Sequence, residues 1–176
     1  MAERWLFRKL GFSLNRGDFL AVTGPSGTGK TSLLRSLNGE LKCEEGSVRN
    51  LARAILPCGV IFQDLQLANG ARAIQNALSG SLGRHSTRNT LFGFPASEKS
   101  SALELLDRLG LADKGEQWTS TLSRGERQRL AIARTLLAGP AILLADEPVA
   151  SLDLDWAEKV LTLLKEKQSQ RNGALV

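Results

Sequence analysis

The stretch GPSGTGKT at residues 24–31 constrains the fold of this chain more than any other. It follows the apolar segment DFLAVT at 18–23, which we expect to form a short strand, and it precedes SLLRSLN, which has helical spacing. The pattern G-x-x-x-x-G-K-[ST] between a strand and a helix is typical of a loop that binds phosphate. We predict that the phosphates of a nucleotide are bound by Gly24, Pro25, Ser26, Gly27, Thr28, Gly29, Lys30 and Thr31.

Two residues of this loop have chemical tasks that glycine cannot perform. Lys30 offers a positive charge to the β- and γ-phosphates, and the hydroxyl of Thr31 offers an oxygen ligand to Mg²⁺. A flexible turn of glycine and serine would not need the lysine. The sequence therefore predicts a phosphate site with a magnesium ion beside it.

The stretch PAILLADEP at 140–148 ends an apolar run in two acids. The run ILLA at 142–145 is typical of a strand that is buried on both faces, and open α/β sheets bind ligands at the carboxyl ends of their strands. Adjacent side chains of a strand point in opposite directions, which suits two different tasks. We expect Asp146 to hold Mg²⁺ and Glu147 to orient and polarise the attacking water.

The stretch TLSRGERQRLAIAR at 121–134 begins with a helix start signal. Ser123 and Glu126 have the S-x-x-E spacing of a capping box, and the apolar spacing that follows predicts a helix over 123–138. Gly125 leaves the first turn free of a side chain, and such a helix N-terminus can bind an anion. From this stretch alone, an anion site and a plain helix start both stay open.

The turn VASLDLD at 149–155 also permits two interpretations. Asp153 fits a helix cap before a helix near Trp156, and it fits a functional role as well.

Composition narrows the class of protein. The 176 residues suffice for one domain with a core, and the sequence shows neither a signal-peptide core nor an apolar run that approaches the length of a membrane span. Cys43 and Cys58 are isolated, which fits a reducing cytosolic setting, and the single histidine, His85, is expected on the surface. The net charge of +5 fits nucleic acid, anionic lipid or nucleotide as a partner, or none of these.

The motifs GPSGTGKT, FQD at 62–64, TLSRGERQRLAIAR, ILLADEP and SLD, in this order, resemble the nucleotide-binding subunits of ABC transporters from about residue 8 onward. The resemblance implies an α/β P-loop NTPase fold, with a RecA-like, mostly parallel sheet flanked by helices and an inserted helical subdomain. Residues 1–65 and 135–176 would form the nucleotide-binding core, and residues 66–134 would form the helical subdomain that carries the signature motif.

The resemblance also implies roles for single residues. Two subunits of the family pack head to tail, and each hydrolyses ATP with Mg²⁺. Ser123 and Gly125 match the residues that face the γ-phosphate bound by the partner subunit. Gln63 matches a glutamine that senses Mg²⁺ and the attacking water and links to the membrane subunit, and Asp153 matches a residue that crosses the dimer interface.

The expected partners follow from the same resemblance: a second nucleotide-binding subunit, in a homodimer, a transmembrane permease and, indirectly, a substrate-binding protein, with no nucleic acid. The expected location is the cytoplasm, peripheral on the inner face of the cell membrane.

The segment RHSTRNTLFGFP at 84–95 and its flanks NALSGSLG and LGLADK resemble the phosphonate-import branch, and an amino-acid or lipoprotein-type transporter is the alternative. A DNA-handling ATPase of this family is disfavoured, since those proteins place long coiled-coil arms between the phosphate loop and the signature.

Three departures from the family pattern affect these expectations. Arg124 and Glu126 stand where most members have glycine and glutamine, and Arg124 either helps to bind the γ-phosphate or obstructs closure. Trp5 is the nearest candidate for the aromatic residue that stacks on adenine, with a core or surface role as the alternative. The sequence stops at NGALV, before the family's switch histidine, so we expect a C-terminally truncated subunit that binds ATP but hydrolyses it poorly.

Overall fold

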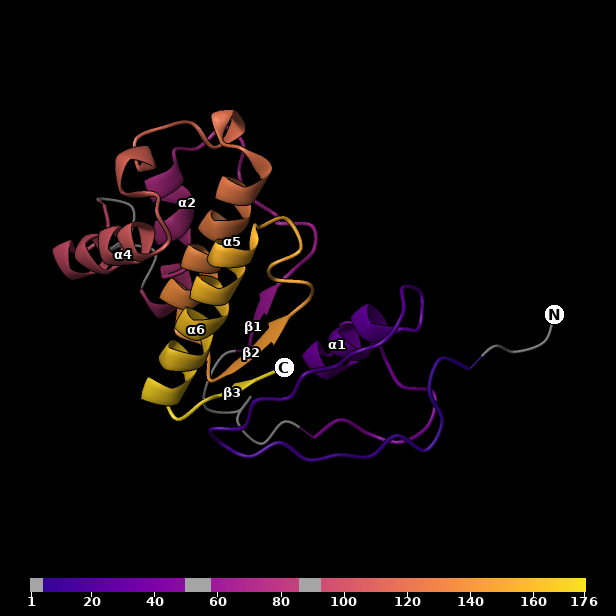
Figure 1. Ribbon diagram of the computed structural model, residues 1–176. Helices are drawn as coiled ribbons and strands as arrows, with labels where there is room; N and C mark the ends of the chain where they lie inside the picture. The colour runs from indigo at the N-terminus through magenta and orange to yellow at the C-terminus, as the bar shows by residue number, and fades with distance from the viewer. Residues whose placement is uncertain (1–4, 50–57, 86–92) are drawn as a thin grey trace.

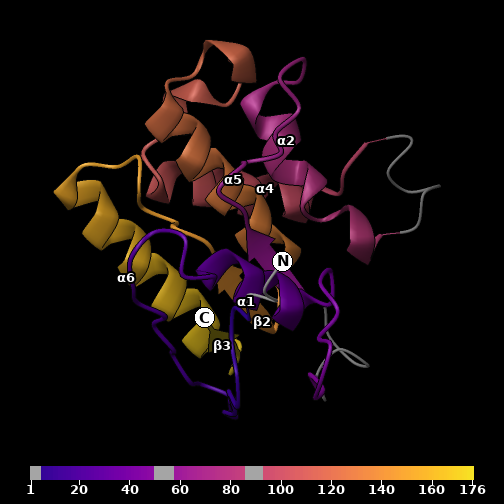
Figure 2. The ribbon, with the colours of Figure 1, turned by 90° about the vertical axis from the view of Figure 1, so that its right-hand side faces the viewer.

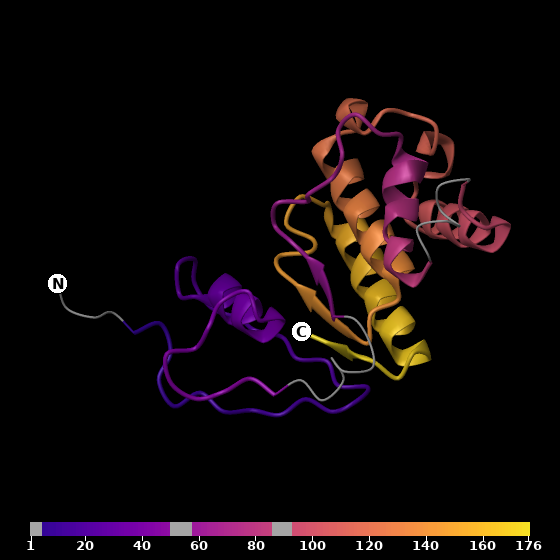
Figure 3. The same ribbon diagram turned by 180° about the vertical axis from the view of Figure 1, so that it is seen from behind.

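The computed structural model of the protein describes residues 5–49, 58–85 and 93–176. Its centre is a parallel sheet of β1 (Cys58–Ile61), β2 (Ile142–Ala145) and β3 (Ala174–Leu175), in the order β1-β2-β3. Helix α1 lies on one side of the sheet, and α5 and α6 lie on the other (Figures 1 and 3). These features confirm the predicted α/β fold.

The helices of the described part differ in length. Their bounds are α1 Lys30–Asn38, α2 Ala73–Ser79, α4 Ala96–Arg108, α5 Arg124–Ala138 and α6 Leu154–Gln170, with single 3₁₀ turns at Leu82–Arg84, Ala112–Lys114 and Thr119–Thr121. None of the helices in the described ranges has the length and apolar character needed to cross a membrane.

The sheet is buried on both faces because neighbouring residues of β2 enter different clusters. Leu143 packs into a large cluster that includes Leu130 of α5 and Leu164 of α6, whereas Leu144 packs against Leu34 of α1. A strand with two buried faces reads as a continuous apolar run. This arrangement confirms the strand that ILLA predicted.

The strand expected over residues 18–23 forms only one bridge, between Phe19 and Leu175. The N–H of Leu175 donates to the carbonyl of Asp18 at 2.9 Å, and the N–H of Leu20 donates to the carbonyl of Leu175 at 2.9 Å. The predicted strand over residues 18–23 is therefore wrong in its extent, since the segment makes one isolated parallel bridge with β3. Phe19 and Val22 stay 47% and 36% exposed, so this segment buries too little apolar surface to complete a strand.

Three helices, α2, α4 and α5, gather into a bundle beside the sheet (Figure 2). Gly80, which follows α2, permits close contact with α5, because a Cβ atom there would lie 1.9 Å from the carbonyl oxygen of Arg134. Helix α5 runs across the boundary that the sequence placed at residue 134, and one apolar cluster joins the bundle to the sheet and α6. The division into a core and a helical subdomain therefore stays a prediction. The segment 84–95 lies partly outside the described residues, since these omit 86–92.

Candidate functional site

The loop at residues 24–31 curls around the ammonium group of Lys30. Its Nζ donates hydrogen bonds to the carbonyl oxygens of Gly24 at 2.8 Å and Pro25 at 2.9 Å. Gly27 and Gly29 have φ angles of 77° and 100°, which residues with a Cβ atom rarely adopt. Helix α1 begins directly after Gly29. The loop is exposed over residues 24–28 and half-buried over 29–31, so a phosphate can reach its backbone N–H groups.

An aromatic side chain lies against this loop, and it is Phe7. A Cβ atom on Gly29 would lie 3.0 Å from Cε1 of Phe7, so the two residues are in close contact. Trp5, which the sequence suggested for adenine stacking, is 36% exposed and has the guanidinium of Arg8 4.8 Å from its ring centroid. Sequence reasoning missed Phe7 because contact between residues 7 and 29 follows no helical or strand period. The stacking role of Trp5 stays a prediction.

The structure brings Gln63, Asp146 and Glu147 to one edge of the sheet. Ile61, the last residue of β1, pairs with Ala145, the last residue of β2, and the N–H of Asp146 donates to the carbonyl of Ile61 at 2.9 Å. Gln63 follows β1 by two positions and is exposed. All three side chains therefore follow the carboxyl ends of neighbouring parallel strands, where ligands bind in open α/β sheets.

The two acids differ in environment, although not by simple strand alternation. Asp146 is buried, with 8% of its surface exposed, whereas Glu147 is exposed. Strand β2 ends at Ala145, and the backbone turns at Glu147, whose φ angle is 50°. Glu147 is thus turned towards solvent by a left-handed backbone conformation, which costs about 1–2 kcal/mol for a residue with a Cβ.

Oxygen ligands for a magnesium ion are available among these residues. Thr31 supplies a hydroxyl, Gln63 an amide oxygen and Asp146 a carboxylate. Mg²⁺ prefers oxygen ligands and is usually held in nucleotide sites by one or two protein groups together with phosphate oxygens. The donor set therefore fits this ion.

The first turn of α5 carries the capping box that the sequence predicted. The N–H of Ser123 donates to Oε2 of Glu126 at 2.7 Å, and the N–H of Glu126 donates to Oγ of Ser123 at 3.2 Å. The hydrogen bond from the N–H of Ser123 is the main reason why the pKa of Glu126 is lowered. Ser123 and Arg124 are exposed, so the helix start is accessible to a ligand.

Asp153 caps helix α6. Its Oδ1 accepts a hydrogen bond from the N–H of Trp156 at 2.9 Å, and α6 begins at Leu154, two residues earlier than expected. The segment before α6 also contacts α5, since a Cβ atom on Gly125 would lie 3.2 Å from the carbonyl oxygen of Ser151. The cap is confirmed, and the role of Asp153 across a dimer interface stays a prediction.

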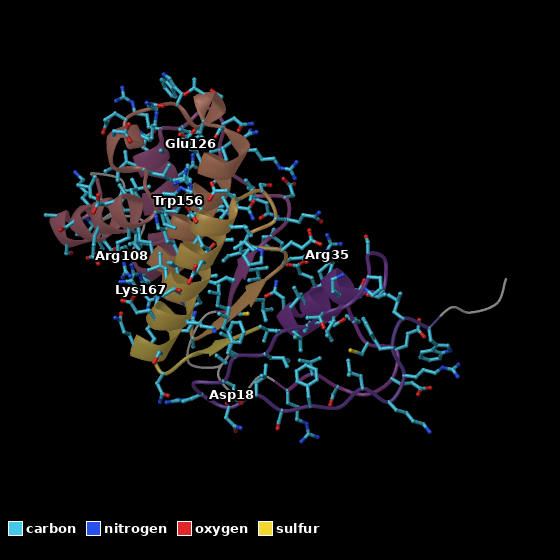
Figure 4. All side chains as sticks on the ribbon, viewed as in Figure 1. Asp18, Arg35, Arg108, Glu126, Trp156 and Lys167 are labelled. Atoms are coloured by element: carbon cyan, nitrogen blue, oxygen red, sulfur yellow. The ribbon has the colours of Figure 1, made fainter. Side chains whose placement is uncertain are left out.

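The phosphate loop and the first turn of α5 lie apart within the chain. Figure 4 shows Glu126, in that turn, at the top of the molecule, and Arg35, on α1, at its right-hand side.

Comparison with known proteins supplies the family. The model of the ABC transporter family matches residues 7–150. The phosphonates import ATP-binding protein PhnC of Trichormus variabilis is 40% identical over 183 aligned residues, which cover 99% of this chain and 75% of that protein. A protein of the same kind from Haloquadratum walsbyi, PhnC 2, is 44% identical over 159 residues, covering 86% of this chain and 56% of that protein.

Solved structures agree with this result. A dimeric bacterial ABC transporter cassette matches with a TM-score of 0.82 and 26% identity, over 100% of this chain and 82% of that chain. A dimeric post-hydrolysis state of an ATP-binding cassette bound to ADP and Pi also matches with a TM-score of 0.82 and 26% identity, over 100% of this chain and 81% of that chain. The chain therefore belongs to the ABC transporter family, among its ATP-binding cassettes.

Proposed function

We propose that this chain is the ATP-hydrolysing subunit of a phosphonate-type ABC importer and that it works as a head-to-tail homodimer. The observation that carries the proposal is the placement of Gln63, Asp146 and Glu147 at one edge of the parallel sheet. The segment that precedes the loop around Lys30 contacts the same sheet through the pairing of residues 18–20 with Leu175.

Each residue of the site has its own role in ATP hydrolysis. Backbone N–H groups of the loop and the ammonium of Lys30 bind the phosphates of ATP. Thr31, Gln63 and Asp146 would hold Mg²⁺, which neutralises charge on the phosphate oxygens when it is bound. Glu147, exposed at the sheet edge, orients a water molecule and accepts its proton as the water attacks the γ-phosphate.

The dimer completes each site. Ser123 is exposed at the start of α5, and the N–H groups of an accessible helix start attract negative charge. In a head-to-tail pair, this turn faces the γ-phosphate held by the partner. The dimeric cassettes that match this fold support such an arrangement.

The catalytic assignment is tested with Glu147→Gln. The amide keeps the shape of the side chain but is a poor proton acceptor, so we expect ATP affinity to be preserved and phosphate release to fall about 10²- to 10⁴-fold. Calorimetry measures the first and a phosphate-release assay the second. Asp107→Asn, on the exposed surface of α4, is the matched control and should keep wild-type turnover. Unchanged turnover in Glu147→Gln would assign the general base to another residue.

The transport assignment needs the membrane partner. The names of the relatives support a phosphonate as the substrate. A transmembrane permease as the docking partner and the inner membrane face as the location belong to the same proposal. We expect ATPase activity in proteoliposomes with the permease to rise when the binding protein carries an alkylphosphonate. Stimulation by an amino acid in place of the phosphonate would support the alternative branch.

A further inference from the structure

A buried glutamine of α5 holds the backbone of Glu147. The Nε2 of Gln128 donates a hydrogen bond to the carbonyl oxygen of Glu147 at 3.0 Å. Gln128 is 5% exposed, lies one helical turn after Gly125 and is the first buried residue of α5. A buried polar side chain is costly unless it is bonded, so this amide has a definite partner in the fold.

The hydrogen bond from Gln128 is accepted by a residue whose backbone conformation is strained. Glu147 has a φ angle of 50° although it carries a Cβ, and its conformation must be held by its surroundings. Its carbonyl oxygen accepts a second hydrogen bond from the N–H of Ala150 at 3.2 Å, within the same turn. The bond from Gln128 comes from a different element and therefore ties this turn to α5.

We propose that Gln128 is a positioning residue for hydrolysis: it fixes the peptide of Glu147 so that the carboxylate of Glu147 faces the attacking water. The inference rests on the proposed function, in which Glu147 is the general base. Gln128 itself does not touch the substrate. Its effect on the reaction passes through the backbone of Glu147.

A second contact extends this link. Gly125, in the first turn of α5, packs against the carbonyl of Ser151, and its added Cβ would lie 3.5 Å from Cδ2 of Leu152. Helix α5 therefore holds the segment 147–153 at two points, through Gly125 and through Gln128.

The test uses Gln128→Met, which keeps the length of the side chain and removes the donor. Loss of one hydrogen bond to a neutral group corresponds to a change of up to about tenfold. We expect kcat to fall by about that factor, with ATP affinity and KM unchanged. We also expect faster hydrogen exchange of backbone amides in residues 147–153, with exchange in the middle of α6 unchanged.

Thr135→Val is the matched control. Thr135 is a buried polar residue of the same helix, and its Oγ1 donates to the carbonyl of Ala131 at 2.9 Å, remote from Glu147. This variant should lose similar stability and keep both kcat and the exchange of residues 147–153. If Gln128→Met does not fold, Gln128→Asn replaces it, since the shorter side chain keeps the amide but withdraws it from the carbonyl.

A double-mutant cycle separates positioning from general damage. In the Glu147→Gln background, Gln128→Met should reduce residual single-turnover hydrolysis no further, because the residue through which it acts is already disabled. An additive loss, or unchanged kcat with unchanged exchange, would overturn the inference. Wild-type turnover in Glu147→Gln alone would overturn the proposed general base instead, and the exchange measurement would still decide whether Gln128 holds this turn.

Discussion

The guanidinium of Arg129 lies over the indole ring of Trp156, with Cζ 4.0 Å from the ring centroid. This contact joins α5 to α6, and Nη1 of Arg129 also donates to the carbonyl of Leu109, just after α4, at 2.8 Å. Gly110 leaves room for the ring, since a Cβ atom there would lie 2.4 Å from Cη2 of Trp156. Burial lowers the pKa of Arg129, against the opposing charges of Glu126 and Asp153. Three helices thus meet at one cation and one ring.

Trp156→Leu should destabilise the fold by about 2 kcal/mol. It removes a cation–π contact and leaves a gap beside Gly110. Urea denaturation followed by circular dichroism measures the change. Trp118→Leu is the control, because Trp118 is 52% exposed, and its cost should stay below about 1 kcal/mol. Equal losses in the two variants would contradict a special role for this junction.

Lys30→Ala should weaken ATP binding roughly 10- to 150-fold, which corresponds to the loss of a charged donor worth about 1.5–3 kcal/mol. The variant also loses the two bonds that Lys30 donates to Gly24 and Pro25. Titration calorimetry measures the affinity. Lys42→Ala, on the exposed segment after α1, controls for the loss of one positive charge and should bind as the wild type does. Near-wild-type affinity in Lys30→Ala would remove the lysine from the site.

Ser123→Arg should leave ATP binding by the monomer intact and prevent ATP-dependent dimerisation. The long side chain would fill the space at the start of α5 where the γ-phosphate of the partner's nucleotide is expected. Light scattering with ATP, in the Glu147→Gln background, follows the dimer. Ser120→Arg adds the same exposed side chain three positions earlier and should still dimerise. Dimers that persist in Ser123→Arg would leave the helix start with a structural role alone.

Glu126→Gln should reduce stability at pH 7 by about 0.3–1 kcal/mol, because the ionised carboxylate suits a helix N-terminus better than an amide does. The pKa of Glu126 is lowered in the folded chain, mainly by the N–H of Ser123. The ionised form therefore stabilises the fold above the unfolded pKa, and this contribution is lost as pH falls through the folded pKa. Denaturation at several pH values should show the two proteins converging under acid conditions. A difference that stays constant down to pH 3 would contradict the mechanism.

Local signals in the sequence were sufficient for the phosphate loop, the capped helix and strand β2. Each depends on residues within a few positions: glycines with Lys30, Ser123 with Glu126, and an apolar run before Asp146. The structure confirms the capping box and the strand because these features need little from the rest of the fold. The family follows from the order of such motifs.

Contacts between distant segments could not be predicted in this way. The isolated bridge at Phe19 depends on pairing with Leu175, and the contact of Phe7 with Gly29 depends on the path of the N-terminal segment. The left-handed backbone at Glu147 contradicts its place after an apolar strand run, and its support by Gln128 comes from another helix. Such features arise from tertiary packing, which local periodicity does not encode.

The pairing of Leu175 with residues 18–20 sets an order for the growing chain on the ribosome (Figure 4 marks Asp18). The phosphate loop is synthesised early, but the segment that fastens it to the sheet is synthesised long after α2, α4 and α5. Those three helices can associate while translation continues, since their contacts span shorter stretches of sequence. The segment before the loop can pair with Leu175 only after β3 has been synthesised. We therefore expect nascent chains to acquire ATP binding only after β3 has emerged.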